Sequence, residues 1–345
     1  MRPARERLPG VPLIDSPFFD EIAADGQWDA ETRRVAEALN RDGFAVIDFP
    51  EPELDALAAD IAASLFADRP WDDWRAGKIE ALERASDAWR DNASVRRIAA
   101  NAEVAALLSR IYGRAAFPFQ TLNFPIGSQQ AAHIDLIHFA SAPENFMCGV
   151  WVALEDVGPG AGPLIYYPGS HRWPVFYNEH IGRPAPFADR IGERVEMFDQ
   201  VWGELRERCG VAPVEFHPRK GQALIWAAGL HHGGAPHTDR TRSRLSQVTH
   251  YFFADCAYWT PLLSNPFAGQ IGFRRGLPDV RTGEPVENGI NGVATPRAFL
   301  DVSAPPMSDA RAAGADGLAA RRGLARRALG RLRRMVTGWG AATDS

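Results

Sequence analysis

The chain has 345 residues, of which 46% are hydrophobic and 23% are charged. These proportions are ordinary for a globular protein and exclude intrinsically disordered and low-complexity classes. No apolar run approaches the roughly 18–20 residues that cross a bilayer, and the N-terminal stretch lacks the apolar core of a secretory signal. Cys148, Cys209 and Cys256 are too few and too far apart for a disulfide framework or a CxxC zinc site. We therefore expect a cytoplasmic protein.

The net charge of -5 is distributed unevenly along the chain. Residues 311–345 contain eight arginines and two aspartates, so a basic tail follows an acidic body. Because phosphate contacts need a basic face on the folded domain, the acidic body argues against nucleic-acid binding. The tail carries apolar residues at helical spacing, which makes it a candidate for weak contact with an anionic membrane or a partner protein. A tail packed on the acidic body and a solvated tail are the alternatives.

The first third of the chain has the periodicity of helices around one strand. Gly43 ends the first helical segment, and Pro50 ends the strand that follows it. The predicted elements, in order, are a helix at 29–43, a strand at 44–49, and helices at 51–67, near 79–93 and at 102–112.

From about residue 115 the character changes to short β-rich runs separated by glycine and proline. Many short strands with turn signals predict a sandwich, a jelly roll or a barrel. A less regular stretch at 173–211 interrupts them, with helical periodicity near 188–208. The β-rich runs are 117–127, 132–140, 146–157, 162–169, 221–229 and 244–254.

His133 and Asp135 form a His-x-Asp motif within one of these runs. On a strand, residues i and i+2 share a face, so the imidazole and the carboxylate would point the same way. With a third ligand from another strand, they form the two-histidine, one-carboxylate set that leaves open positions on Fe(II). The motif alone is a weak signal, because such triplets often arise by chance.

Two adjacent histidines, His231 and His232, and an arginine, Arg244, follow downstream. Arg244 lies in a strand-like run, where burial of its charge requires an anionic partner. A guanidinium matches a carboxylate with two parallel hydrogen bonds. We expect it to bind the distal carboxylate of a dicarboxylic co-substrate, the alternative being a solvent-exposed arginine on an edge strand.

Three segments of the chain resemble the phytanoyl-CoA dioxygenase family of Fe(II)/2-oxoglutarate-dependent oxygenases. They occur in the family's order between Gly43 and Phe253, and read LNFPIGSQQAAHID, GVWVALEDVGPGAGPLIYYPGSH and HGGAPHTDRTRSRLSQVTHYFF. The resemblance implies an all-β core with flanking helices, folded as a double-stranded β-helix (jelly roll, cupin-like). We expect one domain over 1–310, followed by the basic tail at 311–345. Within it we expect a helical part at 1–113, the core at about 114–260 and a lid-like insertion at 173–211.

The resemblance also implies the metal ligands. His133 and Asp135 match the family's proximal pair, and His232 matches the distal histidine because it directly precedes Gly233. His231 would then point to the opposite face of its strand in a structural role.

The same resemblance implies the co-substrate site. Arg244 matches the arginine that binds 2-oxoglutarate, with Arg242 as the alternative. Trp151 stands where the family places a tryptophan lining this pocket, and we expect it to bind the co-substrate, with a core tryptophan as the alternative. Gly234 departs from the family, since many members have a hydroxyl residue there. His250 could share the face of Arg244, but a core histidine is the simpler interpretation.

The implied function is oxidative decarboxylation of 2-oxoglutarate coupled to hydroxylation of a small-molecule C–H bond, with Fe(II), 2-oxoglutarate and O2 as cofactor and co-substrates. Asp135 is retained, which favours oxygen insertion over halogenation. A catalytically silent jelly-roll binding protein and a cupin-like metalloenzyme with another metal are the alternatives. The identity of the substrate is not predicted.

Overall fold

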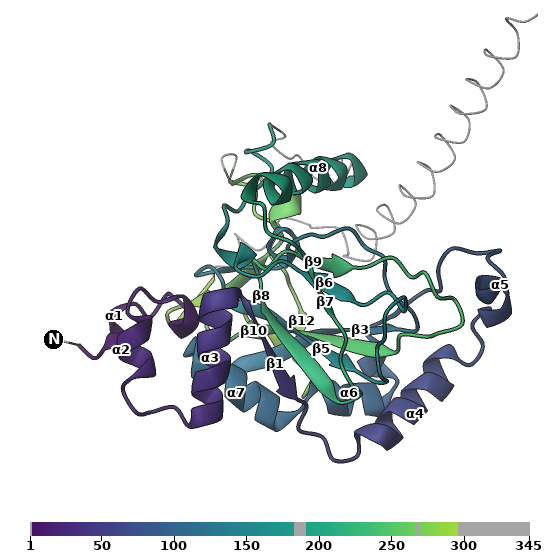
Figure 1. Cartoon of the computed structure of the whole chain (residues 1–345). Helices are drawn as coiled ribbons and strands as arrows, with labels where there is room; N and C mark the ends of the chain where they lie inside the picture. The colour runs from purple at the N-terminus through teal and green to yellow at the C-terminus, as the bar shows by residue number, and fades with distance from the viewer. Residues whose placement is uncertain (1, 183–190, 267–268, 296–345) are drawn as a thin grey trace, which may run out of the picture.

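The computed structural model describes residues 2–182, 191–266 and 269–295 (Figure 1). The tail predicted at 311–345 lies outside the described residues, so the membrane or partner contact expected of it stays a prediction. Within the described part of the chain, no helix is long and apolar enough to cross a membrane.

Short helices fill the N-terminal third, as the periodicity predicts. In α3 (Ala30–Asp42), the carboxylate of Asp29 accepts a hydrogen bond from the backbone N–H of Thr32 at 2.7 Å, which caps the first turn. Gly43 ends this helix in the left-handed conformation, with φ of 82°. The other helices of this part are α1 (Ala4–Arg7), α2 (Phe19–Ala23), α4 (Leu54–Phe66), α5 (Trp71–Arg75), α6 (Ala93–Ala99) and α7 (Ala102–Tyr112).

The helix predicted near 79–93 is wrong. This stretch contains a two-residue strand, β2 (Ala85–Ser86), and a 3-10 turn at Ala88–Arg90. Asp87 between them adopts a left-handed conformation with φ of 53°, its N–H donates to the carbonyl of Thr121 at 2.8 Å, and its carboxylate accepts from the N–H of Thr121 at 3.1 Å. Pairing with the neighbouring strand therefore takes the backbone groups that a helix would have used.

Six strands form the major sheet, in the order β1-β8-β5-β10-β3-β2, and every neighbouring pair is antiparallel. The central strands β5 and β10 are buried along their whole length, because the sheet is covered on both faces. The strands predicted in these regions are confirmed as β1 (Phe44–Asp48), β3 (Ala116–Phe124), β5 (Met147–Ala153), β8 (Gln222–Ala227) and β10 (Ser246–Phe253).

A minor sheet of three strands, in the order β7-β6-β9, faces the major one. Its strands are β7 (Val214–Phe216), β6 (Leu164–Tyr166) and β9 (His232–Gly234). Side chains of both sheets share one apolar cluster, in which the rings of Trp151 and Phe216 lie 5.8 Å apart. Figure 1 shows α4, α6 and α7 on the other side of the major sheet. The two facing sheets with outer helices confirm the double-stranded β-helix.

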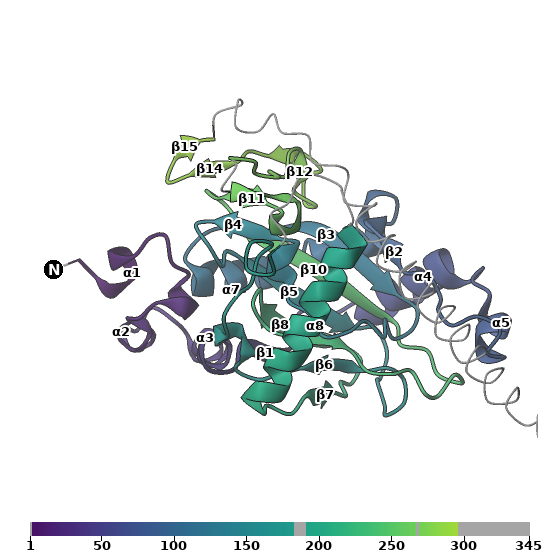
Figure 2. The same ribbon diagram turned by 90° about the horizontal axis from the view of Figure 1, so that it is seen from above.

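The insertion at 173–211 contains α8 (Ile191–Cys209), which agrees with its helical periodicity. Phe198 and Trp202 of this helix are buried in the main core. α8 lies on the side of the sheets opposite α4 and α6 (Figure 1), and it crosses over the strands of the sheets when seen from above (Figure 2). Arg206 donates a hydrogen bond to the carbonyl of Ala132 at 2.9 Å, so α8 is joined to the segment that leads into His133.

Short β pairs complete the described chain. β4 (Ala140–Ala142) pairs with β11 (Ala257–Trp259). The segment after residue 260 contains the two-residue strands β12 (Leu277–Pro278), β13 (Pro285–Val286), β14 (Gly289–Ile290) and β15 (Val293–Ala294).

Candidate metal centre

The two histidines that the motifs single out meet at the edge of the minor sheet. His133 and His232 form an antiparallel bridge, in which each backbone N–H donates to the other residue's carbonyl, at 2.9 and 3.0 Å. Asp135 is the first residue of a 3-10 turn, Asp135–Ile137, so the regular strand expected through the His-x-Asp motif is wrong. The turn still brings the carboxylate to the side of the histidines.

The three predicted ligands converge. One ligand atom each of His133, Asp135 and His232 can be chosen so that all lie within 4.8 Å of one another. Nε2 of His133 is 3.9 Å from Oδ1 of Asp135, and Nε2 of His232 is 3.9 Å from Oδ2. The side chains of Asp135 and His232 are 2% and 7% exposed, so the group is closed to bulk water on most sides. Its composition suits a divalent transition metal, with sites left open for further ligands.

Backbone carbonyls orient both imidazoles. Nδ1 of His133 lies 2.9 Å from the carbonyl oxygen of Ala131, and Nδ1 of His232 lies 2.9 Å from that of Leu230. A carbonyl can only accept, so each Nδ1 carries the proton and donates. Whenever the ring is neutral, Nε2 therefore carries the lone pair on the side of Asp135, and this is the form that binds a metal.

The carboxylate of Asp135 is held by two side chains that the sequence motifs do not assign to the site. The indole Nε1–H of Trp226 donates to Oδ2 at 2.9 Å. Nε2 of His250 lies 3.7 Å from the same oxygen. Burial alone would raise the pKa of Asp135, but the three surrounding imidazoles and the indole N–H hold it well below its usual range. The group is therefore an ionised carboxylate ready to bind a cation.

The positions of these two residues in the chain explain why no motif includes them. Trp226 and His250 lie on β8 and β10, far along the chain from Asp135, and each has the pattern of a core residue in its own strand. The one available signal for His250 was periodicity, because its even spacing from Arg244 would allow the two residues to share a face of the strand. No local motif connects Trp226 to the centre.

Arg244 lies just before β10, and its backbone N–H donates to the carbonyl of Pro125 at 3.0 Å. Its side chain is buried between the rings of Phe124 and Trp151, with the guanidinium carbon 5.6 and 5.5 Å from the ring centres. Nη1 donates to the hydroxyl of Ser246 at 3.1 Å. Nε has no partner, and no carboxylate forms an ion pair with this guanidinium among the residues that the structure describes. Burial lowers the pKa of Arg244 to about 10, against the opposing charge of Glu155.

Arg242, the alternative, lies at the surface. Its Nε donates to Asp239 at 3.1 Å, and its side chain is 54% exposed. Trp151 is a core tryptophan that also touches Arg244, and its indole N–H is buried without a partner in the described structure. The two interpretations of Trp151 are therefore compatible.

His231 and Gly234 flank the distal histidine. His231 packs against Trp173 and Trp202, with ring centres 4.9 and 6.0 Å away, and it does not belong to the converging His–Asp–His group. A side chain on Gly234 would have its Cβ 2.7 Å from Oγ of Ser128, so the loop before His133 fills the space that a hydroxyl residue would need.

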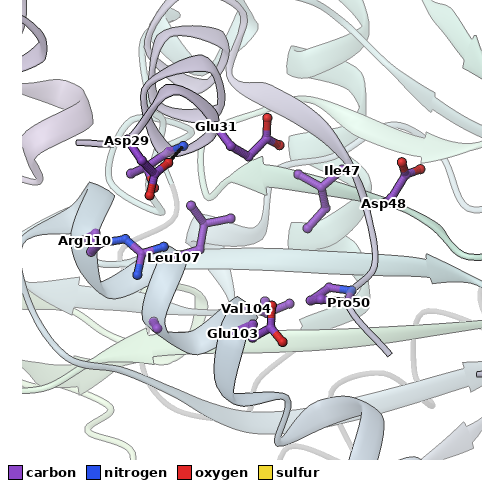
Figure 3. Close-up of a pocket in the computed structure, with 11 residues that line it drawn as sticks. Asp29, Glu31, Ile47, Asp48, Pro50, Glu103, Val104, Leu107 and Arg110 are labelled. Atoms are coloured by element: carbon purple, nitrogen blue, oxygen red, sulfur yellow. Dashed lines mark hydrogen bonds between the residues drawn. The ribbon is translucent and has the colours of Figure 1, made fainter. Parts of the chain in front are cut away.

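A pocket of about 400 Å³ lies elsewhere, between α3, the end of β1 and α7 (Figure 3). Figure 3 shows the carboxylates of Asp29, Glu31, Asp48 and Glu103 around it, with Arg110. Asp29 caps α3 and Glu31 pairs with Arg34 at 2.6 Å, so these groups already serve the helix. None of the three predicted metal ligands lines this pocket.

Known proteins match the chain as follows. The family model described as phytanoyl-CoA dioxygenase (PhyH) matches residues 39–244. Phytanoyl-CoA dioxygenase domain-containing protein 1 of Danio rerio is 28% identical over 144 residues, which cover 39% of this chain and 43% of that protein. The chain thus matches less than half the length of this curated relative.

Two solved structures share the fold. EctD from S. alaskensis with bound Fe has 19% identity and a TM-score of 0.51, covering 84% of this chain and 99% of that one. The non-heme alpha ketoglutarate dependent carbocyclase SnoK from nogalamycin biosynthesis has 17% identity and a TM-score of 0.52, covering 76% and 94%. Since the family model spans more than half of the sequence, this chain belongs to the phytanoyl-CoA dioxygenase family.

Proposed function

We propose that this protein uses Fe(II), 2-oxoglutarate and O2 to hydroxylate a C–H bond of a small molecule. The observation that carries the proposal is the pairing of a buried His–Asp–His group with a buried arginine that lacks a carboxylate partner among the described residues. Either feature alone would also be compatible with a purely structural role. Together they provide one place for a metal ion and one for a dicarboxylate, as this chemistry requires.

His133, Asp135 and His232 would hold the iron. In their neutral form both imidazoles would present the lone pair of Nε2 to the metal, because each Nδ1–H is bound to a backbone carbonyl. The donor set of two nitrogens and a carboxylate oxygen suits iron and leaves positions for a chelating co-substrate and O2. Bound iron and 2-oxoglutarate supply the oxidation, and the protein supplies position, charge and exclusion of water.

Arg244 would bind the distal carboxylate of 2-oxoglutarate. A buried guanidinium with an unpartnered Nε is costly unless an anion completes its hydrogen bonds. Phe124 and Trp151 hold its plane, and the Ser246 hydroxyl takes one of its donors, so the remaining donors are oriented before any ligand arrives.

The substrate would enter beside α8. This helix reaches the centre through Arg206, which binds the carbonyl of Ala132, and through Trp202, which packs on His231. Ala132 directly precedes the proposed ligand His133, and His231 directly precedes the proposed ligand His232. We expect the insertion to select the small molecule, by aromatic contacts for the most part.

Succinate formation tests the proposal. The full chain, loaded anaerobically with Fe(II) and 2-oxoglutarate, should show a visible charge-transfer band, and a set of small metabolites should then be screened for stimulated succinate release in air. A silent binding protein would give neither signal. A centre built for another metal would bind that ion without consuming 2-oxoglutarate. Because SnoK is described as a carbocyclase, products should be examined for ring closure as well as for added oxygen.

A further inference from the structure

The register of the major sheet places Trp226, Gly149 and His250 side by side on β8, β5 and β10. Trp226 pairs with Gly149, and Gly149 pairs with His250, so the three residues form one row across the middle of the sheet. Residues in such a row point to the same face. The two side chains therefore flank a glycine, and both lie next to Oδ2 of Asp135.

Gly149 leaves the room that this arrangement needs. A Cβ at this position would lie 2.1 Å from Cζ2 and 2.3 Å from Cε2 of Trp226. The indole thus lies flat over the glycine, with its N–H extended to Asp135. The ring of His250 stands perpendicular to it, with the ring centres 6.0 Å apart. The side-chain carbonyl of Gln120 lies 3.0 Å from Nδ1 of His250, which fixes that ring.

We propose that Trp226 is a positioning residue that reserves Oδ2 of Asp135, with His250 closing its other flank, so that the carboxylate offers Oδ1 alone to a metal ion. The inference rests on the proposed metal centre. The geometry requires a residue that keeps Oδ2 occupied, because an imidazole Nε2 lies 3.9 Å from each of the two carboxylate oxygens. Without the indole N–H, both oxygens could bind the ion and occupy a position required by the co-substrate or O2.

Removal of a hydrogen-bond partner of a metal ligand generally weakens metal binding. Groups that hydrogen-bond a metal ligand typically change metal affinity by about 10–100-fold when removed. The Trp226→Phe variant deletes the donor and keeps an aromatic ring on Gly149. Trp89→Phe is the matched control, since its indole N–H is also buried but has no acceptor in the described structure.

The experiment is a titration of the metal-free full chain with Co(II), without 2-oxoglutarate, read by the visible absorption of the bound ion. Trp226→Phe should bind Co(II) about 10–100-fold more weakly, with weaker visible bands that report a higher coordination number. Trp89→Phe should match the parent in Co(II) affinity and in the intensity of the visible bands. The thermal unfolding midpoint of each metal-free variant reports whether the fold is intact.

The outcomes separate this inference from the metal centre itself. If Asp135→Ala binds Co(II) like the parent, the proposed centre is wrong. If Asp135→Ala loses the ion while Trp226→Phe retains the parent's affinity and spectrum, the positioning role alone is wrong. Should Trp226→Phe not fold, Gly149→Ala displaces the indole without deleting it and should give the same loss of affinity. Failure of both variants to fold would contradict the inference, because the indole would then serve the fold.

Discussion

His133 and His232 hold each other in place through their backbones, with a pair of N–H to carbonyl hydrogen bonds of 2.9 and 3.0 Å. Their ring centres lie 4.7 Å apart, and each Nδ1 is bound to a carbonyl two residues before it. A metal site built in this way keeps its nitrogen donors aligned through secondary structure. It therefore depends on the bridge as much as on the imidazoles.

The metal ligands can be tested one at a time. His133→Ala, Asp135→Ala and His232→Ala should each abolish Fe(II)-dependent turnover and the thermal stabilisation that added Fe(II) gives the parent, because ligand binding stabilises only a fold that offers the site. His231→Ala should retain the metal-induced shift. Loss of iron binding in His231→Ala, with His232→Ala tolerated, would move the distal ligand by one residue.

The arginine assignment predicts a contrast between two neighbours. Removing the partner of a buried, hydrogen-bonded charge costs on the order of 2–5 kcal/mol. Arg244→Ala should therefore raise the 2-oxoglutarate concentration needed for half-maximal turnover by about 30-fold or more. Arg242→Ala should change little, because that side chain is exposed and paired with Asp239. The opposite ranking would place the carboxylate anchor at the surface loop.

The packing around Gly234 predicts that the hydroxyl residue found here in many family members will lower the stability and the 2-oxoglutarate affinity of this protein. In Gly234→Ser the new Cβ would meet Oγ of Ser128 at 2.7 Å and the backbone N of Gln129 at 2.8 Å. We expect a lower unfolding midpoint and weaker 2-oxoglutarate binding, since overpacking costs about 1–3 kcal/mol. Adding Ser128→Gly should recover part of the midpoint. Tighter 2-oxoglutarate binding by Gly234→Ser would show that the loop moves aside.

His231 should make a contribution to the stability of the metal-free protein that falls as the pH drops below neutrality. Burial between two tryptophans, followed by the charge of Arg206, lowers the pKa of His231 to about 3. In the unfolded chain the imidazole of His231 is protonated below about pH 6.5, whereas in the native state it stays unprotonated down to about pH 3. The contribution of His231 to the free energy of unfolding should therefore decrease between these two values, by at most about 1.4 kcal/mol per pH unit.

Urea unfolding of the metal-free parent and of His231→Gln, at several pH values from 4 to 7, measures this contribution. The glutamine variant cannot take up the proton, so its stability should depend less steeply on pH across that window. Equal slopes for the two proteins would mean that His231 takes up its proton as readily in the native state as in the unfolded chain, against the packing described above.

Local patterns identified much of this protein because they reflect short-range physics. Asp29 and Gly43 mark the two ends of α3 through capping, and five of the six predicted β-rich runs became strands of the two sheets, all except the run at 132–140. The segments around His133 and His232 contain the ligand residue types in recognisable order. The helix expected near 79–93 failed for the complementary reason, since Asp87 is held by a strand that lies elsewhere in the sequence.

The composition, the strand pattern and the His-x-Asp, His-Gly and arginine segments are properties of the sequence by itself, and they were sufficient for the fold class, the family and the candidate ligands. Only the tertiary structure decided between Arg242 and Arg244 as the buried cation, and only it brought Trp226 and His250 to Asp135. These contacts depend on the register of β8, β5 and β10 and on the lack of a side chain at Gly149, which leaves room for the indole. Register and burial arise from all strands packing at once, so no single segment of the sequence encodes them.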